Sequence, residues 1–380
     1  MRAADRAGEI EVGRLAEAGV EVRLGTEVEE LLEHVDVVVK SPGVPADAPP
    51  VRGAREQGVP VWSEIELGYR LLPGNPFIGV TGTKGKTTTV RVLGAMFAAA
   101  GRPAHLAGNE HQPLSEAAGE VSEGEWVVCE LSSFQLEDVH TLACDIAVLL
   151  NIEPDHLDRH GTLDAYREAK LRVFERAGLK VVPRGLGLEG VEFSGEDQLP
   201  AEPAMPGAHN RENAVAATMA ARAAGIDDDA IGEALRSFPG VEHRLELVAE
   251  IEGVRYVNDS KATNTSAARR ALAAYDAPLR LILGGRAKGE SFDGLAAKIG
   301  PRVRSVHLIG EAAGQLASAL EKHGVHYELN GDLETAVRSA AAKAEPGDVV
   351  LLSPACASYD QFSNFEERGE AFRRLVEALR

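Results

Sequence analysis

A glycine- and lysine-rich segment, residues 81–88, has the composition of a loop that binds phosphate. It reads Thr-Gly-Thr-Lys-Gly-Lys-Thr-Thr, follows a β-branched run and precedes a helical pattern. Glycines let backbone N–H groups turn toward phosphate oxygens, a lysine supplies positive charge, and a threonine hydroxyl can reach Mg²⁺. The strict G-x-x-x-x-G-K-[ST] motif is not met, because Val80 occupies its first position. The context still predicts a phosphate loop, with Lys86 facing the phosphates and Thr87 facing the metal.

Acidic and imidazole side chains follow the next predicted strands, where they could hold a metal ion. Glu130 ends one strand, and a dense polar segment, residues 151–160, follows another. His156 and His160 lie four apart, which on a helix would suit zinc. Pro154 and the acidic composition instead favour Mg²⁺ with oxygen ligands. Taken alone, Glu130 could equally be an exposed acid at a strand end, and one histidine could cap the turn.

Other polar residues lie in helical patterns, where a structural role is the default. Lys170 reads as a lysine on a helix surface, and sequence chemistry alone gives it no further role. Asn210 and Asn213 precede an alanine-rich helix. Helix capping is the ordinary explanation for them, and contact with a nucleotide is the alternative.

The C-terminal third contains three more polar segments after predicted strands: residues 257–264, 284–289 and 353–362. The first could be only a capped loop. The second contains Arg286 and Lys288, two cations suited to a carboxylate ligand. The third contains Cys356, but no His/Asp arrangement supports a nucleophile, so we expect a small buried thiol.

These segments need a scaffold that brings strand ends together. Short β-branched runs alternate with alanine-rich helical stretches, which predicts parallel sheets covered by helices. Ligands of such folds bind beyond the carboxyl ends of the strands, so the chemistry should cluster there. The predicted strands are residues 20–22, 35–39, 77–80, 126–129, 146–152, 279–283, 306–309 and 349–352.

Two segments rich in Pro and Gly, residues 72–76 and 238–241, predict linkers. We therefore expect an α/β fold with three domains: a partial Rossmann-like domain (1–74), a central P-loop NTPase-like parallel sheet (75–240) and a Rossmann-like C-terminal domain (241–380). Residues 181–206 are less periodic and predict an irregular β excursion of the central domain. We expect residues 1–5 to be the tail of a strand, with a first βα unit absent from this chain.

Composition excludes several classes of protein. The chain has 380 residues, 44% of them hydrophobic and 26% charged, and a net charge of −19. This describes a soluble globular protein, and so acidic a chain is not expected to bind nucleic acid or an anionic membrane. The first eleven residues have no apolar core of a signal peptide, and no stretch is long enough to span a membrane. Three widely spaced cysteines favour a reducing cytoplasm.

Six motifs occur in the order seen in the Mur ligases, and the chain resembles that family over residues 41–380. The motifs of the last domain are more specific than the phosphate loop. The six are Gly-Thr-Lys-Gly-Lys-Thr (82–87), Glu-Leu-Ser-Ser-Phe-Gln (130–135), Asp-His-Leu-Asp (155–158), His-Arg (243–244), Asn-Asp-Ser-Lys-Ala-Thr-Asn (258–264) and Ser-Pro-Ala-Cys-Ala-Ser (353–358).

The resemblance implies ATP-dependent synthesis of an amide bond. A substrate carboxylate takes the γ-phosphoryl group, and an amine attacks the resulting acyl phosphate. The closest match within the family implies that D-glutamate is joined to UDP-N-acetylmuramoyl-L-alanine during peptidoglycan synthesis. We therefore expect a cytoplasmic, monomeric enzyme that uses ATP and Mg²⁺.

The resemblance also implies roles for individual residues. The implied catalytic residues are Lys86, Lys170, His156 and Lys261, and the implied metal ligands are Thr87, Glu130, His156 and Lys170, the last as a carbamate. ATP is implied to contact Gly82, Thr83, Lys84, Gly85, Lys86, Thr87, Thr88, Asn210, Asn213, Arg244 and Asp259. The other substrates are implied to contact Ser41, Asn109, Ser132, Thr263, Lys288, Ser358 and Phe365, the last four near the D-glutamate carboxylates.

Two departures from the family keep other functions open. The glycine-rich βα unit that opens the family's first domain is missing, and Glu110-His111 stands where the family has Ile-Gly. Affinity for a UDP-sugar is therefore open. The alternatives are a sister Mur ligase, a ligase that adds glutamate to folate, and a catalytically silent nucleotide-binding module.

Overall fold

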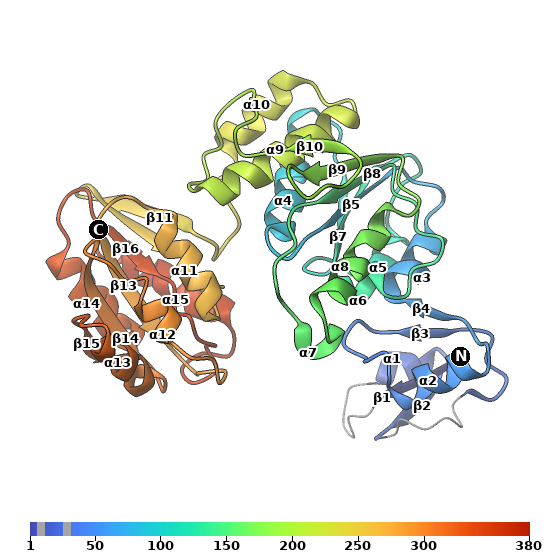
Figure 1. Ribbon diagram of the computed structural model, residues 1–380, viewed down its shortest axis with the longest axis horizontal. Coiled ribbons are helices and arrows are strands. Elements are labelled where there is room, and N and C mark those ends of the chain that lie inside the picture. Colours follow the sequence, from blue (N-terminus) through green and yellow to red (C-terminus); the bar gives the residue numbers. More distant parts are fainter. Residues whose placement is uncertain (6–11, 26–31) are drawn as a thin grey trace. The chain divides into compact units, whose positions relative to one another are not determined.

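The computed structural model describes residues 1–5, 12–25 and 32–380, and it contains two compact units (Figure 1). The first comprises Met1–Pro200 and Val215–Ile231, and the second comprises Ala201–Ala214 and Gly232–Arg380. Both are built from alternating strands and helices, which confirms the α/β fold class. The division into three domains stays a prediction. Residues 6–11, which belong to the N-terminal stretch analysed for a signal peptide, lie outside the described residues, as do residues 26–31.

The first unit contains a six-stranded sheet in the order β10-β9-β8-β5-β7-β6. Every neighbouring pair is parallel, as the alternation of strands and helices predicted. Strands β5, β7 and β8 are buried at every residue, so this is the centre of the unit. The strands are β5 (Phe77–Thr81), β6 (His105–Gly108), β7 (Val127–Leu131), β8 (Ile146–Leu149), β9 (Leu179–Pro183) and β10 (Val191–Phe193).

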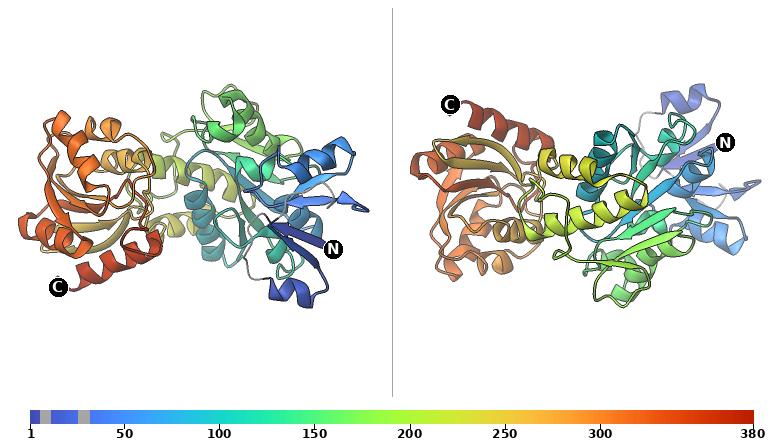
Figure 2. Two further views of the ribbon diagram at one scale, coloured as in Figure 1. Left: turned by 90° about the horizontal axis from the view of Figure 1, so that it is seen from below. Right: turned by 90° about the horizontal axis from the view of Figure 1, so that it is seen from above.

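The β excursion expected at residues 181–206 is partly regular. Its first part extends the central sheet through β9 and β10, whereas Ala201–Pro206 belongs to the second unit. Helices lie on both sides of the sheet (Figure 2). One core is formed by sheet residues with α3 (Glu64–Leu71), α5 (Leu114–Ala117), α6 (Ser133–Leu136) and the turn η2 (Arg172–Phe174), which follows α8 (Leu163–Leu171). Helix α4 (Lys86–Ala99) packs against β5, β6 and β7.

The second unit contains a six-stranded sheet in the order β11-β12-β16-β13-β14-β15. The expectation of a purely parallel sheet is wrong here, because β11 runs antiparallel to β12. Glu252 and Gly253 connect these two strands with positive φ angles of 50° and 77°, as in a tight hairpin. The strands are β11 (Glu246–Ile251), β12 (Val254–Asn258), β13 (Leu279–Gly284), β14 (Val303–Ile309), β15 (Glu328–Gly331) and β16 (Val349–Leu352).

Two separate apolar cores flank this second sheet. One includes helices α11 (Thr265–Ala273), α12 (Asp293–Ala296) and α13 (Ala313–Lys322). The other includes α14 (Leu333–Lys343) and α15 (Phe365–Glu377). Helices α9 (Ala208–Ala223) and α10 (Asp228–Ser237) each contribute residues to both units of the chain.

The described N-terminal residues form two small parallel strand pairs. β1 (Arg2–Asp5) pairs with β2 (Glu21–Leu24), and β3 (Val38–Lys40) pairs with β4 (Val61–Ser63). The strand expected at residues 35–39 therefore begins later and includes Lys40, because the residues before Val38 form a turn. Helices α1 (Gly13–Glu17) and α2 (Pro49–Glu56) lie in the same segment.

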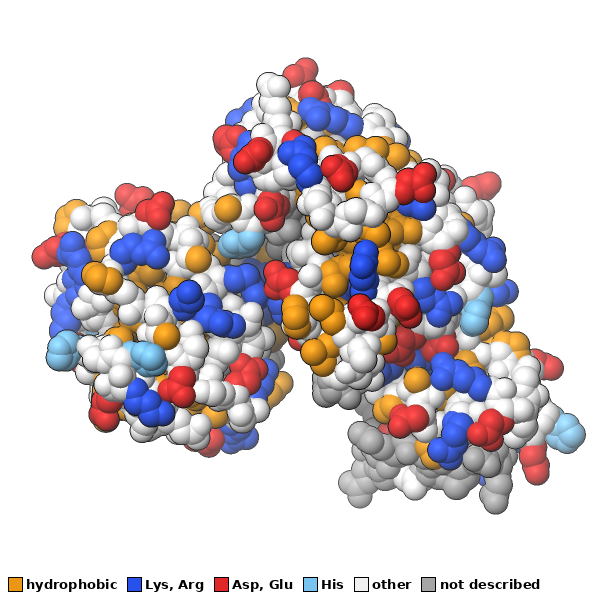
Figure 3. Space-filling model, viewed as in Figure 1, with side chains coloured by type: hydrophobic (Ala, Val, Ile, Leu, Met, Phe, Trp, Pro, Cys, Tyr) orange, Lys and Arg blue, Asp and Glu red, His pale blue; other side chains and the backbone are white. Residues whose placement is uncertain are grey.

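Positive and negative side chains are interspersed over the face drawn in Figure 3. Such mixing is typical of a solvated surface and offers no single-sign patch on that face. In the described part of the chain, no helix combines the length and the apolar character that crossing a membrane requires.

A buried carboxylate, Glu66 of α3, binds the segment that connects α6 to β8. It is 0% exposed and accepts hydrogen bonds from the backbone N–H of His140 (2.8 Å), the hydroxyl of Thr141 (2.7 Å) and Nε of Arg70 (2.7 Å). Burial alone would raise the pKa of Glu66, but these donors and the N–H of Thr141 lower it to about 2. The ionised form of Glu66 therefore stabilises the folded state.

We predict that Glu66→Gln destabilises the first unit by about 3 kcal/mol at neutral pH, the equivalent of a pKa lowered from 4.5 to about 2. The contribution is present above the unfolded pKa of 4.5 and is lost as the pH falls toward 2. Urea unfolding at several pH values, followed by a probe in the first unit, would measure it.

The matched control is Glu123→Gln, at an exposed position of the same unit. It should leave the free energy of unfolding nearly unchanged. A Glu66→Gln penalty that stays constant between pH 7 and pH 3 would contradict the assignment.

Candidate active site

The loop after β5 has the backbone of a phosphate-binding turn. Gly82 and Gly85 have φ angles of 155° and 87°, and α4 begins directly afterwards at Lys86. A Cβ atom at Gly82 would lie 2.9 Å from Cβ of Leu150, so glycine is needed there. The N-terminus of a helix of 14 residues favours an anion, because the first N–H groups of a helix have no carbonyl partner within the helix itself. The structure thus forms the predicted turn from residues 82–88.

The loop is held by the segment that follows β8. Asn151 bonds Lys84 through both atoms of its side-chain amide, at 2.9 Å to the N–H and 3.1 Å to the carbonyl. The hydroxyl of Thr83 accepts from the N–H of Glu153 (3.0 Å) and from the hydroxyl of Tyr166 (3.1 Å). These bonds fix the loop before any ligand binds, which is what preorganised binding requires.

Three lysines converge on this loop. Nζ of Lys86 donates to the carbonyls of Gly82 (3.2 Å) and Thr83 (3.3 Å), and Nζ of Lys170 donates to the same Gly82 carbonyl (2.8 Å). Nζ of Lys84 pairs with Asp155 at 2.9 Å. So much positive charge beside helix N–H groups suits a polyphosphate ligand.

Lys170 is not the exposed helix lysine that its pattern suggested. It is 2% exposed, and its Nζ lies 4.6 Å from the centre of the Tyr166 ring. Burial and the charge of Lys86 lower the pKa of Lys170 to about 7. Near neutral pH a large fraction of this amine is therefore uncharged and nucleophilic.

Glu130 lies at the end of β7, opposite Val80 of β5. It is 1% exposed, which excludes the alternative of an exposed strand-end acid. Burial raises the pKa of Glu130, and the Lys86 charge and the Thr87 hydroxyl only partly offset this. Its Oε2 atom accepts no hydrogen bond within the described residues. A buried carboxylate oxygen without a donor, next to a threonine hydroxyl, fits a ligand of a hard cation.

The loop where the chain departs from the family contacts this carboxylate. Nδ2 of Asn109 lies 3.3 Å from Oε1 of Glu130, and Nε2 of His111 lies 3.7 Å from Oε2. Gly108, with a φ of 101°, permits the close approach, since a Cβ there would lie 2.2 Å from the Glu130 carbonyl oxygen. Asn109 is thus placed at the candidate metal site.

His156 and Ser132 flank the same strand ends. His156 is exposed and directly precedes α7 (Leu157–His160) as its N-cap residue, with a φ of 52°. Its ring contacts the ring of Phe134, at 4.9 Å between centroids. The Ser132 hydroxyl caps α6 and is engaged with Gln135. Among the side chains that the structure describes, which exclude Asp158 as well as residues 6–11 and 26–31, no group of three His, Cys, Asp or Glu residues is spaced to hold a metal. Ser41 is exposed in the loop after β3.

The residues expected near the adenosine of ATP lie in the second unit. Asp259, after β12, accepts from the Ser353 hydroxyl at 2.7 Å, and burial raises the pKa of Asp259 to about 7 despite that bond. The charge of Arg244 acts on the same carboxylate. Asn210 and Asn213 are buried and lie within α9, not before it as expected. Nδ2 of Asn210 donates to the Pro206 carbonyl at 2.7 Å, whereas a helix cap would accept a backbone N–H, so this bond does not support the capping alternative.

The residues expected near D-glutamate meet at one edge of the second sheet. Nζ of Lys288 donates to the hydroxyl of Thr263 at 3.1 Å, and Nζ of Lys261 lies 5.0 Å from the centre of the Phe365 ring. Ser358 is buried in the loop after β16. Strands β12, β16 and β13 are neighbours, so their carboxyl ends bring these loops together.

Arg368 is a site residue that the sequence did not reveal. It is 1% exposed and donates to Ser260 Oγ (2.9 Å), to the Ser260 carbonyl (2.8 Å) and to the carbonyls of Cys356 (3.2 Å) and Ala357 (3.3 Å). It thereby joins the loops that carry Lys261 and Ser358. In the sequence, Arg368 lies in the first turn of a helix that follows a polar loop. Arginines on helix surfaces have the same local pattern, so the sequence did not distinguish it.

Two other assignments are resolved by burial. Cys356 is 0% exposed, and burial raises the pKa of its thiol to about 12, which confirms the expected structural role. Tyr166, which the sequence also did not single out, is buried between Thr83 and Lys170. Aromatic residues on amphipathic helices are usually core residues, so its pattern gave no signal.

Comparison with known proteins agrees with this arrangement. Residues 80–184 match the Mur ligase middle domain, and residues 243–356 match the Mur ligase glutamate ligase domain. The chain is 42% identical to the UDP-N-acetylmuramoylalanine--D-glutamate ligase of Pelotomaculum thermopropionicum, over 98% of this chain and 90% of that protein. It is also 42% identical to the enzyme of that name from Myxococcus xanthus, over 92% of this chain and 86% of that protein.

Solved structures of Mur ligases share the fold. The UDP-N-acetylmuramate-alanine ligase MurC of Thermotoga maritima has a TM-score of 0.62 and 18% identity, covering 100% of this chain and 94% of its own. MurF ligase of Thermotoga maritima, solved with ADP, has a TM-score of 0.62 and 17% identity, covering 92% and 97%. Since the full-length sequence similarity and the fold agree, the chain belongs to the Mur ligase family.

Proposed function

We propose that this chain is an ATP-dependent ligase that joins D-glutamate to UDP-N-acetylmuramoyl-L-alanine in peptidoglycan precursor synthesis. The observation that carries the proposal is 42% identity, over 98% of the chain, to a ligase named for that reaction. An acidic chain with mixed surface charge suits work on small molecules in the cytoplasm, and we expect a monomer.

The reaction proceeds in two steps. An oxygen of the alanyl carboxylate attacks the γ-phosphorus of ATP, and ADP leaves, which creates an acyl phosphate. The amino nitrogen of D-glutamate then attacks the acyl carbon, and the tetrahedral intermediate expels inorganic phosphate to give the amide, with the released protons passing to water. Both steps need negative charge to be stabilised along the phosphoryl path.

The first unit supplies that stabilisation. Backbone N–H groups of residues 82–88 bind the phosphates, and Lys86 exchanges a bond with its own loop carbonyl for one with a phosphate oxygen. Thr87, Glu130, His156 and a carbamate of Lys170 would hold Mg²⁺, which shields charge on the phosphates when bound. Asn109 and Ser132 lie beside this metal site, and Ser41 faces the nucleotide-sugar.

The second unit binds the remaining groups. Asn210, Asn213, Arg244 and Asp259 are the proposed contacts for adenosine, and Lys261 supports the charge of the transition state. Thr263, Lys288, Ser358 and Phe365 surround the D-glutamate carboxylates. A lysine, hydroxyls and backbone N–H groups are the donors that a small dicarboxylate requires.

Phosphate release from ATP and Mg²⁺ would test the function, with UDP-N-acetylmuramoyl-L-alanine present and D-glutamate, L-glutamate, glycine and L-lysine compared. We expect release that requires D-glutamate and the nucleotide-sugar together. Release with another amino acid would move the chain to a sister ligase. Release that ignores every amino acid, or none at all, would favour a silent nucleotide-binding module.

The amine of Lys170 is suited to carbamylation. Its neutral nitrogen attacks CO₂, forms an N–C bond and loses a proton, which turns a cation into an anion that can ligate metal. Because the pKa of Lys170 is lowered to about 7, the reactive neutral form predominates above that pH. The carbamate should therefore be formed at neutral and alkaline pH and be lost as the pH falls below 7.

We predict a carbamate carbon signal in the ¹³C spectrum of the protein equilibrated with labelled bicarbonate, and its absence in Lys170→Arg. Activity of Lys170→Ala should fall by about 100-fold or more, the scale of losing one group that stabilises developing charge. A short carboxylic acid should restore part of it. Lys180→Arg is the matched control and should keep the signal; persistence of the signal in Lys170→Arg would exclude this site.

Lys288 offers a separate test of the amino-acid site. We predict that Lys288→Ala raises the KM for D-glutamate by about 10- to 100-fold, because a hydrogen bond to a charged group contributes about 1.5–3 kcal/mol. The KM for ATP should change little. The exposed Lys298 provides the control variant Lys298→Ala, which should resemble the unaltered chain. Equal KM values for D-glutamate in the two variants would contradict the assignment.

A further inference from the structure

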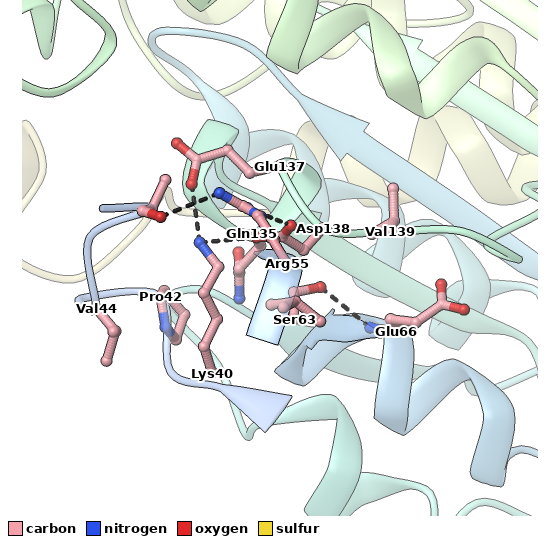
Figure 4. Close-up of polar contacts among 12 residues, drawn as sticks. Lys40, Pro42, Val44, Arg55, Ser63, Glu66, Gln135, Glu137, Asp138 and Val139 are labelled. Carbon is pink, nitrogen blue, oxygen red and sulfur yellow. Dashed lines mark hydrogen bonds and ion pairs between the residues drawn. The ribbon is translucent and has the colours of Figure 1, made fainter. Parts of the chain in front are cut away.

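A buried network of charges joins the loop at residues 41–46 to Glu137 and Asp138, which directly follow α6 (Figure 4). The side chain of Lys40, at the end of β3, is 1% exposed, and its Nζ lies 2.9 Å from Oε2 of Glu137 and 2.9 Å from Oδ2 of Asp138. Nη2 of Arg55 donates to the other oxygen of Asp138 at 2.8 Å. Because Lys40 directly precedes loop 41–46, its two ion pairs hold the start of that loop in place.

The side chain of Arg159 donates hydrogen bonds to backbone carbonyls of the same loop. Nη1 donates to the carbonyl of Pro42 at 3.0 Å, and Nη2 donates to the carbonyl of Val44 at 3.0 Å. Nη2 also donates to Oε2 of Glu137 at 2.9 Å. A guanidinium presents its donors in a rigid plane, so one side chain fixes the spacing of two loop carbonyls. Nη1 of Arg55 holds the carbonyl of Ala46, at 3.0 Å, in the same way.

Arg159, which binds the loop, lies in the short helix that follows His156. Arg159 lies in α7, and its guanidinium carbon is 4.4 Å from the centre of the Phe134 ring. The His156 ring contacts the same phenyl ring, and Nε2 of His160 lies 3.0 Å from the Ser133 hydroxyl. Loop 41–46 and the proposed metal-site turn are therefore parts of one connected structure.

A contribution to the stability of the folded chain is a weak explanation for a buried network of charges. Removing charges from water is costly, and apolar residues of similar volume often replace a buried ion pair without loss of stability. What the charges provide is a defined geometry: the hydrogen bonds of Arg159 and Arg55 end on three carbonyls of one short loop. Hydrogen bonds to the Lys40 and Arg159 cations, with burial acting against them, keep the pKa of Glu137 below its ordinary value, so the carboxylate stays charged.

We propose that Arg159, supported by Glu137 and Lys40, is a positioning residue that holds loop 41–46 in the shape that binds the nucleotide-sugar. The inference rests on the proposed function, because it takes the loop to face that substrate. The guanidinium of Arg159 donates to two loop carbonyls and to Glu137 and lies over the Phe134 ring, so we infer that its effect is transmitted through the loop. The selectivity of the effect for one of three substrates distinguishes it from general destabilisation.

The test compares Arg159→Lys and Arg159→Gln with the unaltered chain. A lysine keeps the charge beside Glu137, so this variant should fold. Its donors share one nitrogen and do not reproduce the spacing of the two guanidinium nitrogens that hold the Pro42 and Val44 carbonyls. We expect the KM for UDP-N-acetylmuramoyl-L-alanine to rise about tenfold or more in both, with the larger rise in Arg159→Gln, since small displacements of positioned groups have effects of this size. The KM values for ATP and D-glutamate should stay within about twofold.

Arg184→Gln is the matched control, because Arg184 also pairs with a carboxylate, Asp197, at 2.8 Å in the same unit but outside this network. It should leave all three KM values unchanged. An independent readout is amide hydrogen exchange of Val44, whose N–H donates to the Ser41 carbonyl at 3.0 Å. Exchange at Val44 should be faster in Arg159→Lys than in the unaltered chain.

The outcomes separate the two proposals. An unchanged KM for the nucleotide-sugar, or an equal rise in the KM for ATP, overturns the positioning role while leaving the function intact. If the unaltered chain shows no turnover that requires D-glutamate, the proposed function fails. Hydrogen exchange then still decides the structural claim, because unchanged protection of Val44 in Arg159→Lys would show that Arg159 does not hold the loop.

Discussion

The parallel pairing of β5 with β7 and β8 is the constraint on which the candidate phosphate site depends. It places Val80 opposite Glu130, and Thr81 opposite both Leu131 and Leu149. The three strands therefore end at the same level, and the loops that follow them share one edge of the sheet. Since backbone groups beyond the strand ends no longer pair within the sheet, they are available to the neighbouring loops and to a ligand.

At this edge of the sheet, burial affects the protonation of the ionisable side chains as well as their charged neighbours do. Lys86 acts on both Glu130 and Lys170, lowering the pKa of each, while burial raises the pKa of the acid and lowers that of the lysine. The net shift favours the uncharged form of both buried groups, because burial outweighs the effect of Lys86 on Glu130 and acts with it on Lys170. A polyphosphate with its cation would restore the balance by supplying both signs of charge. The same groups would thus be costly in the empty loop and stabilising when the ligand is bound.

In the second unit, too, neighbouring parallel strands bring their following loops together at one edge of the sheet. Its neighbouring strands β12, β16 and β13 end in loops that carry Lys261, Ser358 and Lys288. There a buried arginine, Arg368, binds the loops to each other through their carbonyls. Arg159 does the same for loop 41–46 in the first unit. In both units a guanidinium donates hydrogen bonds to backbone carbonyl oxygens of the loops. These bonds do not depend on which side chains the loop residues carry.

Local pattern was sufficient for the central strands of both sheets and for the glycine-rich turn at residues 82–88. Alternating runs predicted both sheets, and glycines with lysines between a strand and a helix predicted residues 82–88, because those contacts form between neighbours in sequence. The strand at residues 35–39 was misplaced, and β6, β11 and β15 were missed. Short strands without a β-branched run give little local signal, and local pattern does not indicate where a turn begins or which way a strand pairs.

The sequence by itself determined the fold class, the approximate positions of the central strands and the family motifs. Only the tertiary structure decided that Lys170 is buried on the Gly82 carbonyl, and that Arg159 meets the loop after Lys40. The physical reason is that these side chains bind backbone carbonyls far away in the chain. A carbonyl is present at every residue, so it leaves no signature in the sequence, and burial, which sets the pKa of Lys170, exists only in the folded protein.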